Sequence, residues 1–320
     1  MDHWCAPGRF SGSSRKYADR VVLVVLPTCA KIAPVEDLHT LAVSHVSKAM
    51  GTPPLTVTAE GRWTVLGWTT TDSTNSRAMS ALRTSPRGTL DHFVLHVDHQ
   101  TAGRGQQQRS WTATPEDLAI TLILEHKLPA SAPFSLNLAV SLAVIQAIED
   151  VIPSVQSQDL MIKWPNDIMF KGSKAGGILI ENSWRGNAWS SSVIGIGLNL
   201  SGRAPFPNAT CLLPNGLPSE TTASELRQAI LLRADSRLAE MAHPAPLLQQ
   251  YHQRLFGWGQ RQRWQLDGQE VRGTLERIDI EGRLCVNAEG AQHSFSPGGV
   301  GWWGLEPRGR AGGTKLVLHS

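Results

Sequence analysis

The sequence predicts an α+β fold in which a central mixed β-sheet carries packed helices and a small β-barrel follows at the C-terminal end. Between residues 93 and 200, short apolar and β-branched segments alternate with a long helical pattern, which is typical of a sheet covered by helices. From about residue 260, short strands are separated by glycine-containing turns and no helical pattern intervenes. The 320 residues are 41% hydrophobic and 18% charged, as in ordinary globular proteins.

The chain divides into four predicted parts. Residues 1–60 read as an N-terminal extension of unknown role, and Met50 is an alternative start to Met1. Residues 61–257 form the main domain, 258–305 the small C-terminal domain, and 306–320 a tail.

In the main domain, the apolar stretches predict sheet strands and the longer patterns predict helices. The expected strands are 93–97, 118–124, 160–163, 177–180 and 193–200, and the expected helices are 76–82, 135–151, 222–241 and 247–256. The helix 135–151 is apolar nearly all round, which predicts that it is buried. Thr222 and Glu225 form a capping box at the start of the third helix, after a proline-rich loop.

The C-terminal domain is predicted from four short strands with tight turns between the first three. Asp267-Gly268 and Glu281-Gly282 supply the turn residues. The expected strands are 262–266, 270–277, 283–288 and 293–296.

Composition narrows the function classes. Thirty Lys and Arg against 27 Asp and Glu give a net charge of +3, so sequence-independent nucleic-acid binding is not the expected main activity. The four cysteines form no CxxC pair, which favours a reduced, cytoplasmic protein. No apolar run approaches the roughly 20 residues of a membrane span, and the early run 21–26 is too short for a signal peptide.

Three polar segments carry the candidate chemistry. Residues 71–75 precede a helical pattern, so they predict an N-cap whose side chains could also bind a polar head group. Gly103 and Gly105 flank Arg104, an arrangement that lets backbone N–H groups and a guanidinium meet an anion, or else a flexible polar loop. It matches neither a dinucleotide fingerprint nor a Walker loop.

The third segment is a strand–turn–strand hairpin with two lysines. Lys163 ends an apolar strand and Lys174 begins the next strand, so both ammonium groups predict an anionic ligand such as a triphosphate. Asp167, in the turn between them, is a candidate Mg²⁺ ligand because Mg²⁺ prefers oxygen ligands and few protein carboxylates.

Five motifs, in this order and spacing, make residues 63–304 resemble the biotin protein ligases. They are Asp72-Ser73-Thr74-Asn75; Gln100-Thr101-Ala102-Gly103-Arg104-Gly105 with Trp111; Lys163-Trp164-Pro165-Asn166-Asp167; Lys174-Ala175-Gly176-Gly177-Ile178-Leu179; and Gly195-Ile196-Gly197-Leu198-Asn199. The resemblance implies the biotin/lipoate ligase fold, related to class II aminoacyl-tRNA synthetases, with an SH3-like C-terminal barrel.

The resemblance also implies an activity, substrates and a partner. The enzyme activates biotin with ATP and Mg²⁺ as biotinyl-5′-AMP and transfers it to a lysine of a biotin carboxyl carrier protein of acetyl-CoA carboxylase or a related carboxylase. Both nucleophiles come from substrates, so the protein supplies positioning and charge neutralisation. A membrane association is not expected, and a homodimer is compatible with the resemblance.

Site residues follow from the resemblance position by position. The residues assigned to biotin are Ser73, Thr74, Asn75, Gln100, Arg104, Gly105, Gln106, Lys174 and Gly177. Those assigned to ATP are Gly103, Arg104, Arg109, Trp111, Lys163, Asn166 and Asn199. Arg104, Lys163 and Lys174 are the candidate catalytic groups, and all three are expected to converge on one anion.

One departure affects the loop after Gly105. Many family members continue with a basic, glycine-containing stretch, whereas this chain has Gln106-Gln107-Gln108-Arg109. Fewer cations predict a weaker hold on biotinyl-AMP.

Two alternatives stay open. A lipoate ligase shares the adenylation logic, but its typical Arg-Arg-x-Gly-Gly-Gly stretch is absent. A ligase that is also a DNA-binding repressor would need an N-terminal helix-turn-helix, of which residues 38–50 resemble only the second half.

Overall fold

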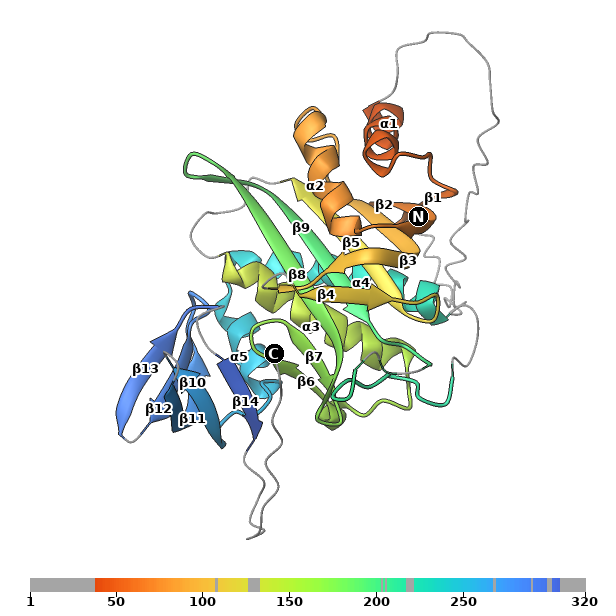
Figure 1. Ribbon diagram of the computed structural model, residues 1–320. Helices are drawn as coiled ribbons and strands as arrows, with labels where there is room; N and C mark the ends of the chain where they lie inside the picture. Colours follow the sequence, from red (N-terminus) through yellow and green to blue (C-terminus); the bar gives the residue numbers. More distant parts are fainter. Residues whose placement is uncertain are drawn as a thin grey trace, which may run out of the picture.

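The computed structural model describes residues 38–106, 109–125, 133–202, 204, 206–216, 222–266, 269–288, 290–297 and 301–305. Figure 1 shows a large sheet with helices against it and a smaller separate sheet, drawn in blue, that holds the last strands. The predicted α+β class is confirmed, and the main sheet is mixed because one of its strand pairs is parallel.

The large sheet has nine strands in the order β1-β2-β3-β5-β9-β8-β7-β6, with β4 paired to β3. Only β2 and β3 pair in parallel among the described pairs, and the long β8–β9 hairpin contributes two central strands. The bounds are β1 Thr56–Glu60, β2 Trp63–Thr71, β3 Phe93–Arg104, β4 Ser110–Ala113, β5 Leu118–Glu125, β6 Leu160–Lys163, β7 Asp167–Phe170, β8 Ser173–Arg185 and β9 Ala188–Leu198.

Helices cover both faces of this sheet. One apolar core lies between the sheet and α3, α4 and α5, and a second core lies between the sheet and α1 and α2. The alternation of β3 separates them, since Val94 belongs to the first core and Leu95 to the second. The bounds are α1 Leu38–Met50, α2 Thr74–Thr84, α3 Phe134–Val151, α4 Thr222–Ala239 and α5 Ala245–Gln253.

The helix α3 is long and apolar enough to cross a membrane by length and composition alone, yet 72% of it is buried inside the protein. Thirteen of its 18 residues are buried, which explains why its sequence is apolar nearly all round. The helix predicted over 135–151 is therefore confirmed as the central helix of the larger core.

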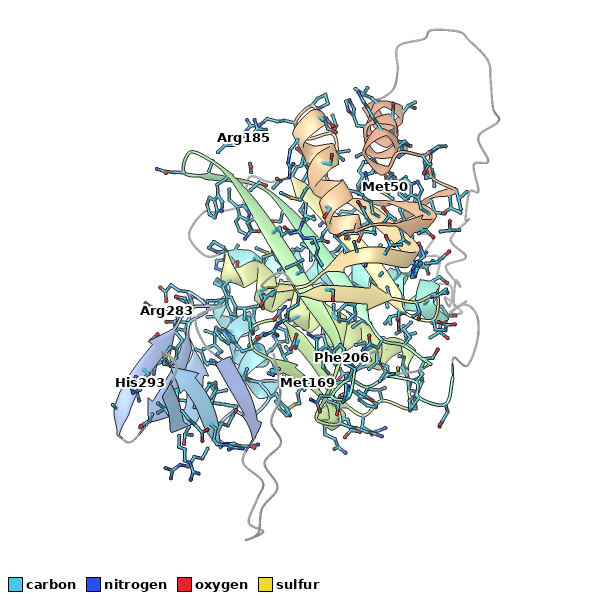
Figure 2. The ribbon with its side chains drawn as sticks, viewed as in Figure 1. Met50, Met169, Arg185, Phe206, Arg283 and His293 are labelled. Atoms are coloured by element: carbon cyan, nitrogen blue, oxygen red, sulfur yellow. The ribbon has the colours of Figure 1, made fainter. Side chains whose placement is uncertain are left out.

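The N-terminal residues that the structure describes belong to the main domain. Strand β1 pairs with β2 along its whole length, and α1 buries Ala42, Val46 and Met50 in the second core. Met50 is labelled in Figure 2 at the end of α1. The boundary predicted at residue 61 is thus wrong for residues 38–60, because their buried faces complete the core against α2. Residues 1–37, which would hold the first half of a helix-turn-helix, lie outside the described residues.

The C-terminal unit is a five-stranded antiparallel sheet in the order β13-β12-β11-β10-β14. The predicted set of four strands gains β14, and the described pairings form an open path and not a closed barrel. The bounds are β10 Arg261–Leu266, β11 Gln269–Ile278, β12 Leu284–Ala288, β13 Ala291–Phe295 and β14 Gly301–Leu305. The predicted tail, 306–320, lies outside the described residues.

This sheet contacts the main domain at the hairpin between β6 and β7. The Trp164 indole N–H donates to the Gly282 carbonyl at 2.9 Å, and a Cβ at Gly282 would come within 2.3 Å of Phe134. From α5, His252 Nε2 accepts from the Ile278 N–H at 2.9 Å. The C-terminal sheet therefore packs directly on the strand end that presents Lys163.

Candidate functional site

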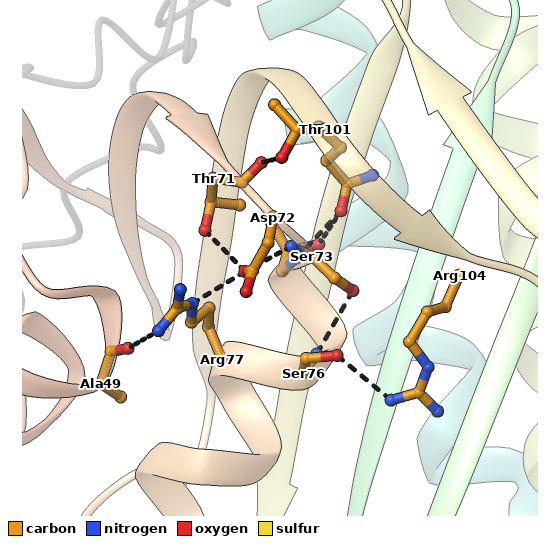
Figure 3. A network of polar contacts seen from close by, with 10 residues as sticks. Ala49, Thr71, Asp72, Ser73, Ser76, Arg77, Thr101 and Arg104 are labelled. Atoms are coloured by element: carbon orange, nitrogen blue, oxygen red, sulfur yellow. Dashed lines mark hydrogen bonds and ion pairs between the residues drawn. The ribbon is translucent and has the colours of Figure 1, made fainter.

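The N-terminus of α2 is built around Ser73, which caps the helix. Strand β2 ends at Thr71, and the Ser73 Oγ accepts from the Ser76 N–H at 3.4 Å, so the N-cap reading of this segment is confirmed. Ser73 is 2% exposed and its own N–H donates to Asp72 Oδ1 at 2.6 Å (Figure 3). The polar motif 71–75 therefore forms the start of the helix α2.

The next residue, Thr74, contacts Gln100 from β3. Both the Thr74 N–H and its hydroxyl donate to Gln100 Oε1, at 2.9 and 3.1 Å. The Thr121 hydroxyl of β5 lies 2.7 Å from the Thr74 hydroxyl. With its carbonyl oxygen so engaged, Gln100 presents its amide nitrogen as the group suited to a ligand acceptor.

Asn75 is held on three sides. Its Oδ1 accepts from the Thr121 hydroxyl at 2.7 Å, and its amide donates to the Leu179 carbonyl and to Glu181 Oε2 at 3.3 and 3.0 Å. A Cβ at Gly195 would lie 2.4 Å from Asn75 Oδ1, so the strand must carry glycine there. Both amide protons are used inside the protein, which leaves Asn75 an acceptor at most for a ligand.

Thr74, Asn75, Gln100 and Thr121 together form an amide cluster. Arg104 lies beside this cluster, at the end of β3. Its guanidinium forms an ion pair with Glu181 and donates to the Ser76 hydroxyl at 3.2 Å, as Figure 3 shows for Ser76. After it, the Gly105 N–H donates to the Arg109 carbonyl at 2.7 Å, which closes a tight loop that includes Gln106. Gln107 and Gln108 lie outside the described residues.

Trp111 lies between the amide cluster and the lysines. A Cβ at Gly197 would come within 2.4 Å of its ring, and the Lys174 ammonium lies 6.0 Å from the ring centroid. Gly103 packs on its backbone, since a Cβ there would lie 2.3 Å from the Trp111 carbonyl oxygen. The indole Nε1 is buried and has no hydrogen-bond partner among the residues that the structure describes.

The hairpin between β6 and β7 and the start of β8 gather the charges. Lys174 Nζ lies 2.6 Å from Asp167 Oδ1, and Asp167 pairs in register with Lys163. Burial lowers the pKa of Lys163, and the charges of Lys174 and Arg109 lower it further, while Asp167 opposes them. These four side chains form one cationic group with a single carboxylate.

The expected convergence of Arg104, Lys163 and Lys174 is not what the structure has. The positive charge of Arg109 acts on Lys163, whereas Arg104 is paired with Glu181 on the α2 side of the site. The sequence could not show which of the two arginines acts on the lysines, because both lie in the short segment 104–109 and the fold sets where their side chains point.

Three further predicted residues hold the framework. The Asn166 amide donates to the Ile178 carbonyl at 2.7 Å, tying the hairpin to β8. Gly177 lies opposite Asp167, and a Cβ there would lie 3.7 Å from Lys174 Nζ. Asn199 is 1% exposed and donates to the Thr210 carbonyl at 3.2 Å, but its Oδ1 has no partner in the described part of the chain.

Thr121 and Glu181 join the site without having been predicted. Thr121 is buried in the middle of β5, and Glu181 lies on β8 in contact with both Asn75 and Arg104. A hydroxyl within an otherwise aliphatic strand was the available signal for Thr121. Glu181 follows an apolar run directly and looked like the solvated end of a strand.

The candidate site thus has a hydroxyl–amide end at α2 and a cationic end at the β6–β7 hairpin, with Trp111 between them. The first end suits a neutral polar head group and the second suits phosphate oxygens. Within the described residues, no three His, Cys, Asp or Glu side chains gather as a metal site. The Asp167 carboxylate lies next to Lys174, and one protein carboxylate suits Mg²⁺ where phosphates and water supply the other oxygens.

Comparisons with known proteins agree with these motifs. The model of the biotin/lipoate A/B protein ligase family matches residues 69–199. A biotin–[acetyl-CoA-carboxylase] ligase of Mycobacterium tuberculosis is 33% identical over 237 residues, which are 72% of this chain and 85% of that protein. A ligase of the same name from Paracoccus denitrificans is 34% identical over 160 residues, covering 50% of this chain and 63% of the relative.

A solved structure shares the fold. The biotin protein ligase from Aquifex aeolicus in complex with biotin and ATP superposes with a TM-score of 0.61 at 21% identity, covering 75% of this chain and 98% of that one. Together with the identity and coverage of the Mycobacterium tuberculosis relative, these matches show that the chain belongs to the biotin/lipoate A/B protein ligase family, as a biotin protein ligase.

Proposed function

We propose that this protein is a biotin–[acetyl-CoA-carboxylase] ligase, which activates biotin with ATP and transfers it to a lysine of the carboxylase's biotin carrier. The relatives from Mycobacterium tuberculosis and Paracoccus denitrificans carry that name. The observation that supports it most directly is the order of groups along the site, where buried hydroxyls and amides lead past Trp111 to Lys174, Lys163 and Arg109.

In this assignment biotin binds at the α2 end. Ser73 Oγ and the Gln100 amide nitrogen meet its polar ring atoms, while the Ser76 N–H holds Ser73 Oγ and Thr74 holds Gln100. The carboxylate at the other end of biotin then reaches toward Lys174. ATP lies on the far side of Trp111, with the orphan Asn199 oxygen suited to accept from the nucleoside.

The first step forms the mixed anhydride. A biotin carboxylate oxygen attacks the α-phosphorus of ATP, the bond between that phosphorus and the bridging oxygen breaks, and pyrophosphate leaves. Negative charge increases on phosphate oxygens, and Lys163, Lys174 and Arg109 are placed to offset it. Lys174 first has to exchange Asp167 for the substrate anion, because its ammonium is paired with that carboxylate here.

Asp167 is then available for the magnesium ion that accompanies ATP. The metal, when bound, would neutralise charge on the pyrophosphate leaving group. This chain contributes a single carboxylate to it, so metal affinity should depend on ATP being present.

The second step transfers biotin. The neutral amine of a carrier lysine attacks the anhydride carbonyl, a C–N bond forms, the bond to the AMP oxygen breaks, and the amine loses a proton. The anhydride is hydrolysable, so this step requires a site that excludes water.

The test is an exchange assay. Purified protein is incubated with ATP, Mg²⁺, labelled pyrophosphate and either biotin or lipoate, and in a second reaction with biotin and a biotin-carrier domain that is probed with avidin. Exchange that depends on biotin, and avidin binding that depends on the carrier's acceptor lysine, are expected. Exchange with lipoate alone would make the protein a lipoate ligase, and no exchange with either acid would reject the proposal.

A further inference from the structure

Arg77 joins two segments that lie far apart in the chain. It sits in the first turn of α2, where its Nε donates to Asp72 Oδ1 at 2.8 Å and its Nη1 donates to the Ala49 carbonyl at 2.9 Å. Figure 3 shows the guanidinium between α1 and the Asp72 side chain. Ala49 belongs to the last turn of α1, whose carbonyls lack partners within the helix and favour a nearby cation.

Asp72 is the centre of this contact. One of its oxygens, Oδ1, accepts from Arg77, from the Ser73 N–H at 2.6 Å and from the Thr71 hydroxyl at 3.2 Å. Its backbone carbonyl accepts from the Ala102 N–H at 2.8 Å, which ties it to the strand carrying Arg104. Burial alone would raise the pKa of Asp72, but the hydrogen bonds from Arg77 and Ser73 and the Arg77 charge lower it, so it is ionised at neutral pH.

Ser73 depends on this carboxylate for its orientation. Its backbone N–H points at Asp72, and its hydroxyl caps the helix at Ser76, the same residue that accepts from Arg104. If the Asp72 carboxylate lost its hydrogen bond from Arg77, the peptide bond before Ser73 could rotate. The Ser73 hydroxyl and the Arg104 contact would then move together.

We infer that Arg77 is a positioning residue for the biotin end of the site, and that through it the helix α1 acts as part of the catalytic unit. The inference rests on the proposed function, which supplies biotin as the ligand. It goes beyond the proposed function because Ala49 lies outside residues 69–199, the part of the chain that matches the family model. Neither Arg77 nor α1 is among the groups assigned to either substrate.

The effect is on orientation more than on stability. The side chains of Arg77 and Asp72 are 36% and 44% exposed, and an ion pair so exposed adds little to the free energy of unfolding. A small displacement of a binding group, in contrast, can cost a large factor in turnover or affinity. A lysine cannot replace the arginine, because a single ammonium lacks the planar fork that meets Asp72 and Ala49 together.

The experiment compares Arg77→Met and Arg77→Lys with the full-length wild type. The matched control is Arg83→Met, which removes an exposed arginine from the last turn of the same helix. We expect Arg77→Met to raise the KM for biotin in pyrophosphate exchange by about tenfold, because a displaced Ser73 hydroxyl would lose a hydrogen bond to biotin. The KM for ATP and the melting temperature should stay near wild type, and Arg77→Lys should resemble Arg77→Met.

Two further measurements separate positioning from other roles. Asp72→Asn and the double variant with Arg77→Met should show non-additive effects on the biotin KM, because both changes release the same contact. Amide hydrogen exchange should be faster over residues 72–76 and at the end of α1 in Arg77→Met. This readout needs no substrate.

Several results would overturn the inference. They are an unchanged biotin KM in Arg77→Met, equal rises in the KM values for biotin and ATP, additive effects with Asp72→Asn, or unchanged exchange over residues 72–76. If Arg77→Met does not fold, the same outcomes in Arg77→Lys decide it. Absence of biotin-dependent exchange in the wild type would reject the proposed function, while the hydrogen-exchange result would still decide the role of Arg77.

Discussion

At the scale of single residues, the site is shaped as much by glycines as by polar groups. Gly195 and Gly197 lie two positions apart on β9, so both face the same side of the sheet. A Cβ on the first would lie 2.4 Å from the Asn75 amide, and one on the second 2.4 Å from the Trp111 ring. The two glycines therefore serve opposite ends of the site.

Alanine at these two positions should affect different substrates. We expect Gly195→Ala to raise the KM for biotin and Gly197→Ala to raise the KM for ATP, each by about 10- to 100-fold, because each displaces one binding group by an ångström or more. Each variant is the control for the other in steady-state exchange assays. Equal effects of both variants on both substrates would show that the two ends are not separate.

Lys174 is one of the two lysines that we propose to neutralise charge on the phosphate oxygens. Lys174→Ala should slow adenylate formation by on the order of 10²-fold, as when a preorganised donor is removed from a growing anion. Its Asp167 partner would then be left unpaired, so Asp167→Asn in the same chain should restore stability but not rate. Single-turnover formation of biotinyl-AMP measures the rate, and a wild-type rate in Lys174→Ala would remove the lysine from the mechanism.

The glutamine loop gives a third test at this scale. Gln106 occupies a position where many family members have a basic residue, and Arg109 is the only described cation of the loop after Arg104. Gln106→Arg should slow release of biotinyl-AMP, since an added cation would attract the phosphate. Release is followed by trapping free adenylate, and equal release rates in the two proteins would contradict the hypothesis.

At the scale of elements, the C-terminal sheet and the β6–β7 hairpin meet at one glycine. Gly282 has a φ of +84° and lies against Phe134, while its carbonyl accepts from Trp164, next to Lys163. The β12 end of the sheet thus supports the strand end that carries Lys163.

Gly282→Ala should therefore destabilise the protein and weaken ATP binding. Gly290 is the matched control, because its φ is +85° but a Cβ there would meet no atom within 4 Å. Both alanines carry the same backbone strain, whereas Gly282→Ala adds overpacking, so it should lose about 1–3 kcal/mol more free energy of unfolding than Gly290→Ala. Urea denaturation compares them, and equal losses would mean that the contact with Phe134 relaxes freely.

At the scale of the whole molecule, a partly buried polar group connects three elements. His96 of β3 is partly buried and feels the positive charge of Arg227 of α4, and Arg227 is paired at 2.6 Å with Glu60 of β1. Burial lowers the pKa of His96 to about 4, and the Arg227 charge lowers it further. The folded protein therefore holds His96 neutral where the unfolded chain would protonate it.

Stability should fall as the pH drops below the ordinary histidine pKa of 6.5. The contribution of His96 is complete above pH 6.5 and is lost progressively toward pH 4, with about 2 kcal/mol lost by pH 5. His96→Gln should remove that part of the pH dependence while leaving Arg227 and Glu60 paired. Urea denaturation at pH 7 and pH 5 measures it, and the same slope in both proteins would locate the titration elsewhere.

Much of this architecture could be predicted because it depends on local patterns. The central helix predicted over 135–151 forms α3, and the strands predicted at 93–97, 118–124 and 160–163 form within β3, β5 and β6. The short strand β4 was missed because it is stabilised by pairing with β3 and not by a pattern in its own residues.

The sequence by itself determined the fold class, the order of the five motifs and the family, because each is written in neighbouring residues. Only the tertiary structure decided which groups meet. Glu181 reaches Asn75 across 106 positions, and Arg77 reaches Ala49 across 28, so neither contact leaves a local pattern. The fold brings the charge of Arg109 to act on Lys163 and pairs Arg104 with Glu181. The sequence gives the number of charged residues, but the position of each charge is set only when the sheet brings these strand ends together.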